Sequence, residues 1–253
     1  MKIVGQKRFG PGDFSVGLVN EALAMLCKSG FTPEMLKRVA DLKSGMAEKF
    51  VNLFPKAMRQ IVDAYESIRR DWEKFYENNF NLKVDFSALH IPKCPGSGWR
   101  LLFIAQGIGS EQAFQISKQV FRKAWKYYDA SLDVVIVKNE RSNKDGAYAI
   151  WVRDGQEAEE IHKNKSANQI EAEKLLTETC LERLIHGLKY FRETGKQLDV
   201  KNVTLCSGSR YCGGSVPSVY RSDIYGRLSV SYDCPGDAYD FLRAREVSCE
   251  EDR

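Results

Sequence analysis

The five residues from Cys206 to Arg210, which read Cys-Ser-Gly-Ser-Arg, bring together a thiol, two hydroxyls and a guanidinium within one short turn. A thiolate can attack phosphorus while loop amides and an arginine hold the phosphate oxygens. That chemistry needs a longer separation between cysteine and arginine than the three residues found here. It also needs a helix N-terminus or a cation to lower the pKa of the thiol, and the residues that follow indicate a turn and a strand. The preferred interpretation is a small, buried cysteine at the end of a strand.

Arginines and tyrosines also occur at the ends of several other expected strands. If these arginines gather, they form an anion-binding patch of bidentate donors. If they are scattered, each makes a surface ion pair worth under about 1 kcal/mol. We predict a surface that binds a ligand or partner and includes Arg153, Cys206, Ser207, Ser209, Arg210, Tyr220 and Arg221. The further arginines Arg243 and Arg245 would extend it.

The sequence gives no complete metal-binding or catalytic pattern. Cys206, Cys212 and Cys234 could converge on a metal ion, but structural zinc favours closely spaced ligand pairs and the chain has no Cys-X-X-Cys. None of the three histidines lies in that segment. We therefore predict no metal, no cofactor and no catalytic residue.

Glu178, Glu182 and His186 follow one another at intervals of four residues, so they share one face of a helix. Such a face could bind a metal or transfer protons. It lies almost opposite the apolar stripe of Leu181, Leu184 and Leu188, which predicts a solvated polar face.

The residues Gly107-Ile108-Gly109-Ser110 follow an expected strand and open an expected helix, as a phosphate-binding loop would. Gln112 stands where a third glycine belongs, and Glu111 would repel a phosphate in the first helical turn. The preferred prediction is a tight turn between strand and helix.

The elements that must position these residues alternate between strands and helices after residue 98. Apolar and β-branched runs predict strands at 99–106, 132–137, 147–153, 203–206, 216–221 and 227–232. Helical spacing predicts helices at 111–128 and 170–193, with a short closing helix at 237–247. The turn at 143–146 would make 132–153 a hairpin. The order β-α-β-β-α-β-β-β predicts an α+β domain over 99–247 with a mostly antiparallel sheet.

The first part of the chain, 1–95, predicts a unit of about three helices, at 15–27, 32–53 and 55–78. Residues 79–98 contain prolines and glycines without a sustained period, which is typical of a linker. Residues 1–98 hold 15 Lys/Arg and 11 Asp/Glu, so they carry the whole net charge of +4. Basic helices of this kind could bind nucleic acid, although a solvated helical surface explains the same charges.

Bulk composition indicates a globular protein in a reducing compartment. Hydrophobic residues make up 43% and charged residues 28% of the chain. No apolar run is long enough for a membrane helix and no secretory signal is visible, so we predict no membrane association. Seven scattered cysteines without a dense framework favour free thiols and a cytoplasmic location.

Four segments of the chain resemble known sequences. The residues YAIWVRD at 148–154, KSAN at 165–168, LERLIHGLKYFRETGKQLD at 181–199 and NVTLCSGSR at 202–210 resemble a group of uncharacterised proteins from uncultured bacteria. The resemblance covers 99–247. It implies a bacterial origin and brings no activity, cofactor or catalytic residue with it.

Three functions follow as hypotheses. The first is a non-catalytic binding or adaptor protein that uses the turns of the 99–247 domain, with a protein as its partner. The second is an enzyme that acts on an anionic or nucleotide-like substrate near Cys206–Arg210. The third is a nucleic-acid-binding protein that uses the basic N-terminal helices.

Overall fold

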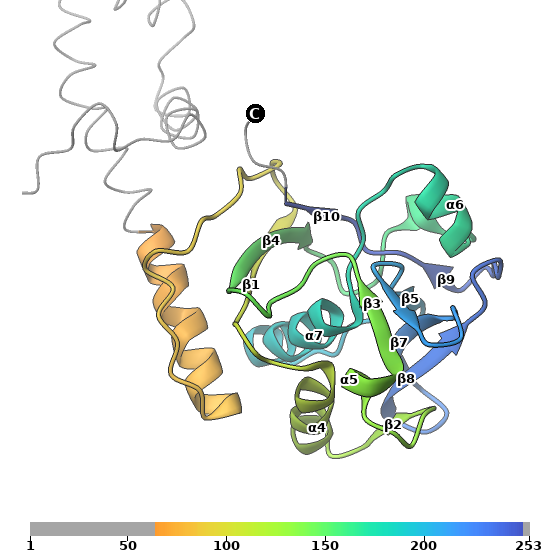
Figure 1. Ribbon diagram of the computed structural model, residues 1–253, viewed down its shortest axis with the longest axis horizontal. Helices are drawn as coiled ribbons and strands as arrows, with labels where there is room; N and C mark the ends of the chain where they lie inside the picture. The colour runs from red at the N-terminus through yellow and green to blue at the C-terminus, as the bar shows by residue number, and fades with distance from the viewer. Residues whose placement is uncertain (1–63, 250–253) are drawn as a thin grey trace, which may run out of the picture. The chain divides into compact units, whose positions relative to one another are not determined.

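The computed structural model describes residues 64–249, within which one compact unit begins at Trp72 (Figure 1). The predicted helices at 15–27 and 32–53 and most of the helical unit 1–95 lie outside these residues. The basic side chains proposed to bind nucleic acid lie outside them too: Arg38, Lys43, Lys49, Lys56 and Arg59.

Helices and mixed sheets make the described part an α+β fold. A helix covers 64–80, and the further helices are α4 Ser110–Phe121, α5 Leu132–Val135, the 3₁₀ turn η1 Glu160–His162, α6 Ala167–Ala172 and α7 Cys180–Thr194. The strands are β1 Trp99–Ile104, β2 Ala124–Lys126, β3 Ile136–Asn139, β4 Tyr148–Arg153, β5 Val203–Leu205, β6 Ser209–Tyr211, β7 Val216–Ser222, β8 Arg227–Asp233, β9 Leu242–Arg243 and β10 Val247–Ser248. They form sheets of order β1-β4-β10, β2-β8-β7-β5-β9 and β3-β6.

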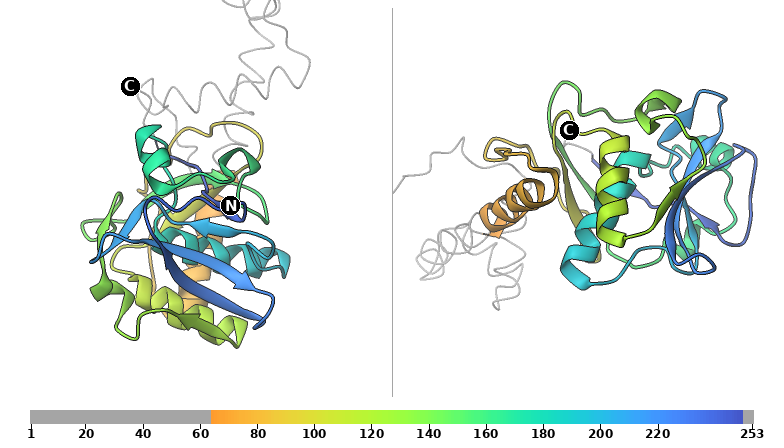
Figure 2. Two further views of the ribbon diagram at one scale, coloured as in Figure 1. Left: turned by 90° about the vertical axis from the view of Figure 1, so that its right-hand side faces the viewer. Right: turned by 90° about the horizontal axis from the view of Figure 1, so that it is seen from below.

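Helix α7 lies between the two larger sheets, where it contacts β1 on one side and β7 on the other (Figures 1 and 2). The hydroxyl of Thr179 and the carboxylate of Glu182 cap its first turn reciprocally, which is the capping box. Gly195 ends it in the left-handed conformation, as its sequence predicts. The predicted single helix at 170–193 is wrong, because residues 173–179 separate α6 from α7 and each helix begins at its own capping box.

The antiparallel pair of β1 and β4 forms the other wall of this interior, with Trp99 opposite Arg153. Residues 101–104 of β1 are buried, which explains their continuous apolar sequence. The rings of Trp72 and Phe86 pack on Phe103 of β1, at centroid distances of 5.9 and 5.1 Å. Residues 72–98, for which the sequence indicates a helix end and a linker, thus lie against this sheet.

Three local predictions are wrong. Helix α4 ends at Arg122, whose φ of 62° is left-handed, and 124–126 becomes β2, which pairs parallel with β8. Residues 132–135 are helical, and the 132–153 hairpin does not form, because β3 pairs with β6 and β4 with β1. The closing helix at 237–247 is replaced by the short strands β9 and β10. No helix in 64–249 is long and apolar enough to cross a membrane.

We expect Tyr76→Phe to lower the free energy of unfolding by about 1–3 kcal/mol, because it leaves unpaired one buried backbone group of β1 and one directly after that strand. The Tyr76 hydroxyl donates to Phe103 O at 2.7 Å and accepts from Ala105 N at 3.1 Å. Urea denaturation of the full chain measures the change. The control is Tyr225→Phe, since Tyr225 is exposed; equal stability of the two variants would contradict the assigned role of Tyr76.

Candidate functional site

A cavity of about 630 Å³ lies beside the N-terminal ends of α4 and α7. Its walls come from the turn at 107–110, from α5 and β3, and from the loop at 139–144. Apolar side chains and cations line it together: Ile108, Leu132, Ile136 and Leu181, with Lys138, Arg141 and Lys144. The positive ends of two helix dipoles and three cations therefore surround one volume.

The turn at 107–110 has a shape that its two glycines allow. Gly107 has a φ of 76°, and its N–H donates to Asn143 O at 3.2 Å. A side chain at Gly109 would collide with the carboxylate of Asp133, whose Oδ2 would lie 2.3 Å from the added Cβ. Asp133 accepts from Glu111 N at 3.3 Å, so a carboxylate of the protein already caps α4. The carboxylate of Glu111 turns away to Lys126 and Leu132 N.

Asn143 fixes the loop opposite this turn. Its side-chain amide is buried and donates to Ala105 O at 2.7 Å and to Ile108 O at 2.9 Å. The loop at 139–144 is therefore tied to the end of β1, and the two sides of the cavity are held at a constant separation.

Arg141 connects the cavity to the N-terminus of α7. Its Nε and Nη2 donate to the two carboxylate oxygens of Glu182, each at 2.7 Å, and Tyr148 donates to the same carboxylate at 2.8 Å. Burial alone would raise the pKa of Glu182, but Arg141, with the N–H of Thr179 and the Tyr148 hydroxyl, holds that pKa below its usual range. Glu182 is therefore ionised, and its pair with Arg141 places the guanidinium at the cavity wall.

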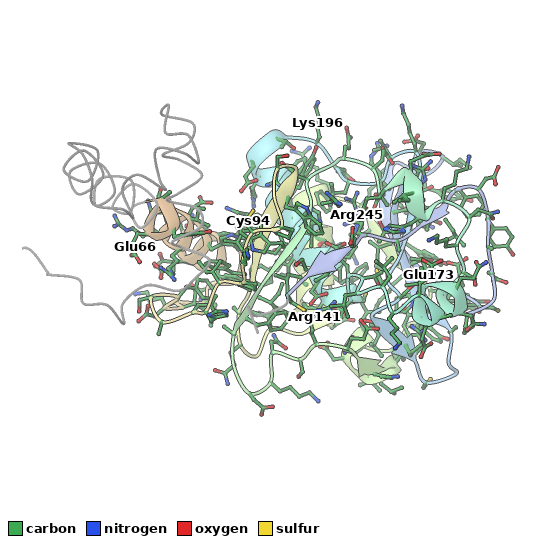
Figure 3. The ribbon with its side chains drawn as sticks, turned by 90° about the horizontal axis from the view of Figure 1, so that it is seen from above. Glu66, Cys94, Arg141, Glu173, Lys196 and Arg245 are labelled. Carbon is green, nitrogen blue, oxygen red and sulfur yellow. The ribbon has the colours of Figure 1, made fainter. Side chains whose placement is uncertain are left out.

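Asp199 is the centre of a second buried network, none of whose side chains lines the cavity. Its carboxylate accepts from Arg183 Nε at 2.8 Å, from Arg245 Nη2 at 2.6 Å and from Ala158 N at 3.1 Å, and Thr204 also donates to it. Burial by itself would raise the pKa of Asp199, yet the two arginines and Thr204 lower it to about 2. Figure 3 shows Arg245 inside the domain, whereas Lys196 and Glu173 lie on its surface.

The predicted solvated helical face is wrong, since Glu182 and His186 of α7 are fully buried and Glu178, also buried, precedes the helix. Glu178 Oε1 lies 2.7 Å from His186 Nδ1. Burial raises the pKa of Glu178 to about 8, and burial together with Arg245 and Arg183 lowers the pKa of His186 well below its usual value. At neutral pH a protonated Glu178 therefore donates to a neutral imidazole.

The turn from Cys206 to Arg210 contacts the start of α7. Ser209 Oγ accepts from Cys180 N at 2.9 Å, and a side chain at Gly208 would lie only 2.8 Å from Thr177 O. Cys206 is fully buried, which raises the pKa of its thiol well above the ordinary value, contrary to what a nucleophile requires. Arg210 donates to Ser207 O at 2.6 Å, so this turn closes on itself.

The other predicted site residues lie apart from this turn. Arg153, at the end of β4, stacks on the ring of Trp99 at 4.2 Å and pairs with Glu246. Tyr220 and Arg221 lie in β7, where Arg221 pairs with Asp223. Arg210 pairs instead with Glu171. These arginines therefore have different carboxylate partners in different places.

Sequence reasoning considered the 107–110 turn as a phosphate loop but preferred a plain turn, and it missed the opposite wall of the cavity. Residues 138–144, at the end of β3 and in the loop after it, carry two lysines, an arginine and two asparagines after an apolar run, a signal that could have identified them. Comparison of the chain with protein-family models, curated proteins and solved structures finds no match.

The free energy of unfolding of the wild-type protein should fall as the pH rises, and we expect Glu178→Gln to abolish the part of this fall that Glu178 causes. A folded-state pKa of about 8, above the ordinary value of 4.5, means that the folded state keeps a proton that the unfolded state has lost. Glu178 alone should therefore lower wild-type stability by at most about 1.4 kcal/mol per pH unit between pH 6.5 and 8. The glutamine amide still donates to His186 but does not titrate.

Denaturation at several pH values in this window tests this expectation. The stability of the glutamine variant relative to wild type should rise steadily toward pH 8. Glu173→Gln, an exposed glutamate, is the control. A constant difference between Glu178→Gln and wild type would mean that Glu178 is ionised in the folded protein.

Proposed function

We propose that this protein is a non-catalytic binding protein and that the cavity between the 107–110 turn and the 138–144 loop takes a small organic anion. The observation that carries the proposal is the set of three cations around one cavity. Arg141 is engaged by Glu182, but Lys138 and Lys144 make no ion pair with any described residue. Two ammonium groups are thus available for a carboxylate or phosphate.

The size and lining of the cavity suit a molecule of nucleotide size. Ligand pockets for small molecules commonly measure about 300–1,000 Å³ and combine an apolar lining with a few polar groups. Here the apolar side chains would contact the body of the ligand, while the lysines at the rim would contact its charge. Asp133 opposes an anion, so it should limit affinity and select against ligands that approach the start of α4.

Catalysis receives less support from this arrangement. A nucleophilic or acid–base mechanism needs side chains such as a thiolate or an imidazole at the substrate. Neither Cys206 nor His186 lines the cavity. The alternative of an enzyme that uses Cys206–Arg210 also conflicts with the raised pKa of the buried thiol.

We expect the double variant Lys138→Gln/Lys144→Gln to bind AMP and pyrophosphate about tenfold or more weakly than the wild-type chain, because each lysine contributes a charge at the rim. Asp133→Asn should bind them several-fold more tightly, since asparagine still caps the helix but no longer repels the anion. Isothermal titration at two salt concentrations measures both changes.

Lys196→Gln removes an exposed charge that does not line the cavity, and it should leave the affinity unchanged. If removing each of the three lysines changed the affinity equally, the effect would come from the overall charge of the protein and not from the cavity. If Asp133→Asn bound the anions more weakly than wild type, the proposed position of the ligand would be refuted.

A protein partner is the second candidate, and one exposed aromatic cluster favours it. Tyr127 and Tyr232 are 48% and 38% exposed, and their ring centroids lie 4.4 Å apart. Tyr128 adds a third ring, 5.1 Å from Tyr127. Tyrosine supplies large contact area at protein interfaces with few freely rotating bonds. The cluster lies beside β2, the edge strand of the five-stranded sheet, where a partner could dock.

The second candidate is tested by capturing proteins from a host lysate on the immobilised chain, once with nuclease and once without it. A protein that binds the wild-type chain should be lost with Tyr127→Ser/Tyr232→Ser and kept with Tyr225→Ser, a matched exposed tyrosine in the turn before β8. Equal capture by both variants would exclude the tyrosine cluster as the docking surface. Binding that disappears only with nuclease would favour nucleic acid instead.

A further inference from the structure

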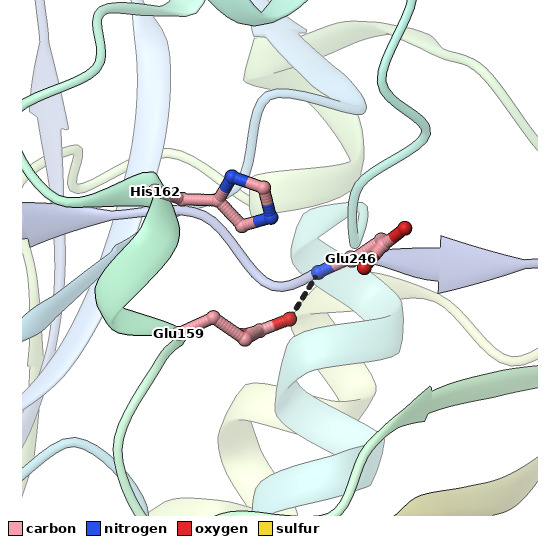
Figure 4. Close-up of side chains that lie close together, drawn as sticks. All are labelled: Glu159, His162 and Glu246. Atoms are coloured by element: carbon pink, nitrogen blue, oxygen red, sulfur yellow. Dashed lines mark hydrogen bonds between the residues drawn. The ribbon is translucent and has the colours of Figure 1, made fainter. Parts of the chain in front are cut away.

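Three side chains from two distant segments converge at a place remote in sequence from the cavity walls (Figure 4). One ligand atom each from Glu159, His162 and Glu246 lies within 4.8 Å of the other two. Glu159 directly precedes the 3₁₀ turn η1 and His162 is its last residue, and residues three apart in such a turn lie on the same side. Glu246 comes from the connection between β9 and β10, and its N–H donates to Glu159 Oε1 at 2.8 Å.

The imidazole of His162 has no hydrogen-bond partner among the described residues, although it is only 5% exposed. Both its ring nitrogens are buried, and Glu159 Oε2 beside them is buried and unpartnered as well. Buried polar atoms are nearly always paired in folded proteins, so each orphan needs an explanation. A metal ion would supply a partner for the imidazole and for the free oxygen of Glu159.

We propose that Glu159, His162 and Glu246 bind a divalent transition-metal ion of the zinc class. One imidazole and two carboxylates are ligands that Zn²⁺, Mn²⁺ and Fe²⁺ accept, whereas Ca²⁺ and Mg²⁺ prefer oxygen alone. Two carboxylates also balance the double charge of the ion. Tetrahedral ligands about 2.0–2.2 Å from zinc lie roughly 3.3–3.6 Å apart, so ligand atoms separated by up to 4.8 Å would have to approach one another by about 1 Å.

The charges around the cluster are compatible with this assignment. Arg153 Nη2 lies 3.5 Å from Glu246 Oε2, a long contact, and its guanidinium stacks on Trp99. The side chain of Glu246 is 30% exposed, so it can turn its other oxygen to an ion without breaking a short bond. Three protein ligands leave at least one coordination position for water.

The surrounding structure positions the cluster in advance. Arg243 donates to Ala158 O at 3.2 Å, just before Glu159. Arg245, which directly precedes Glu246, donates to Gly155 O and Gln156 O at 3.0 and 2.9 Å. Both segments that carry ligands are therefore tied together by arginine–backbone bonds that do not involve the ligand side chains.

The chain has three histidines, which makes the site directly observable. The full chain, labelled with ¹⁵N-histidine and treated with a chelator, is titrated with Zn²⁺ and followed by the imidazole signals in NMR spectra. We expect one equivalent of Zn²⁺ to shift the His162 ring alone. His90 is exposed and His186 is paired with Glu178, so both serve as internal controls. Saturable shifts at His90 or His186 in place of His162, or no shift at all, would overturn the assignment.

Variants separate ligation from a structural role. His162→Gln, Glu159→Gln and Glu246→Gln should each weaken Zn²⁺ binding by about a hundredfold or more in competition with a chromophoric chelator. His90→Gln should leave it unchanged. Glu246→Gln keeps the backbone bond to Glu159, and its thermal unfolding without metal shows whether the fold is retained. Wild-type affinity in a folded Glu246→Gln chain would refute the site.

Cobalt distinguishes these ligands from the free cysteines, of which Cys212 and Cys234 are exposed. Co²⁺ bound to nitrogen and oxygen gives weak visible bands, whereas thiolate ligands add an intense charge-transfer band. We expect the weak bands alone at one equivalent. A thiolate band lost on alkylation of the cysteines would assign the metal to sulfur and reject the Glu159–His162–Glu246 site.

Discussion

The described domain depends on the buried ion pairs of Asp199, because its carboxylate binds two arginines that have no access to water. Arg183 belongs to α7 and Arg245 to the C-terminal segment, while Thr204 brings β5 to the same carboxylate. Removing one member of a buried ion pair leaves an uncompensated charge, which costs about 3–5 kcal/mol. The positions of three chain segments are therefore coupled through one side chain.

The backbone of Asp199 extends this coupling. Its φ of 53° is left-handed, which aspartate tolerates better than most residues, and its N–H and C=O pair with Gln156 and Arg221. The loop at 155–158 is thus held by Asp199 from one side and by Arg245 from the other. Because this loop leads into Glu159, the proposed metal site inherits its geometry from the buried network. The cavity depends on the same N-terminal turn of α7, through Glu182, which directly precedes Arg183 and pairs with Arg141.

Much of the backbone could be predicted from the sequence wherever a pattern has a local cause. β1 and β4 follow from apolar runs, and the end of α7 follows from Gly195. The α+β class follows from the order of such elements. The pairing of β3 with β6 and of β2 with β8 could not be predicted, because it joins residues roughly 70–100 positions apart that no local spacing relates. The short strands β9 and β10 likewise take their conformation from their partners.

The predicted solvent exposure of the polar side chains was wrong for a different reason, for which α7 is the example. Helical periodicity identifies which residues share a face, but it does not tell a solvated polar face from one that is buried against opposite charges. Glu182 of α7 is interior because Arg141, from a distant segment, pairs with it. His186 is interior beside Glu178, which precedes the helix and lies 2.7 Å from the imidazole.

One local feature of α7 accompanies its buried polar side chains. Gly187 lowers helix stability relative to alanine by about 1 kcal/mol, so its presence in mid-helix needs a reason. A side chain there would lie 2.8 Å from Arg183 Nη1, so the glycine makes room for the guanidinium that binds Asp199. In α7, the glycine four residues after Arg183 therefore allows the guanidinium to lie along the helix and reach the buried carboxylate of Asp199.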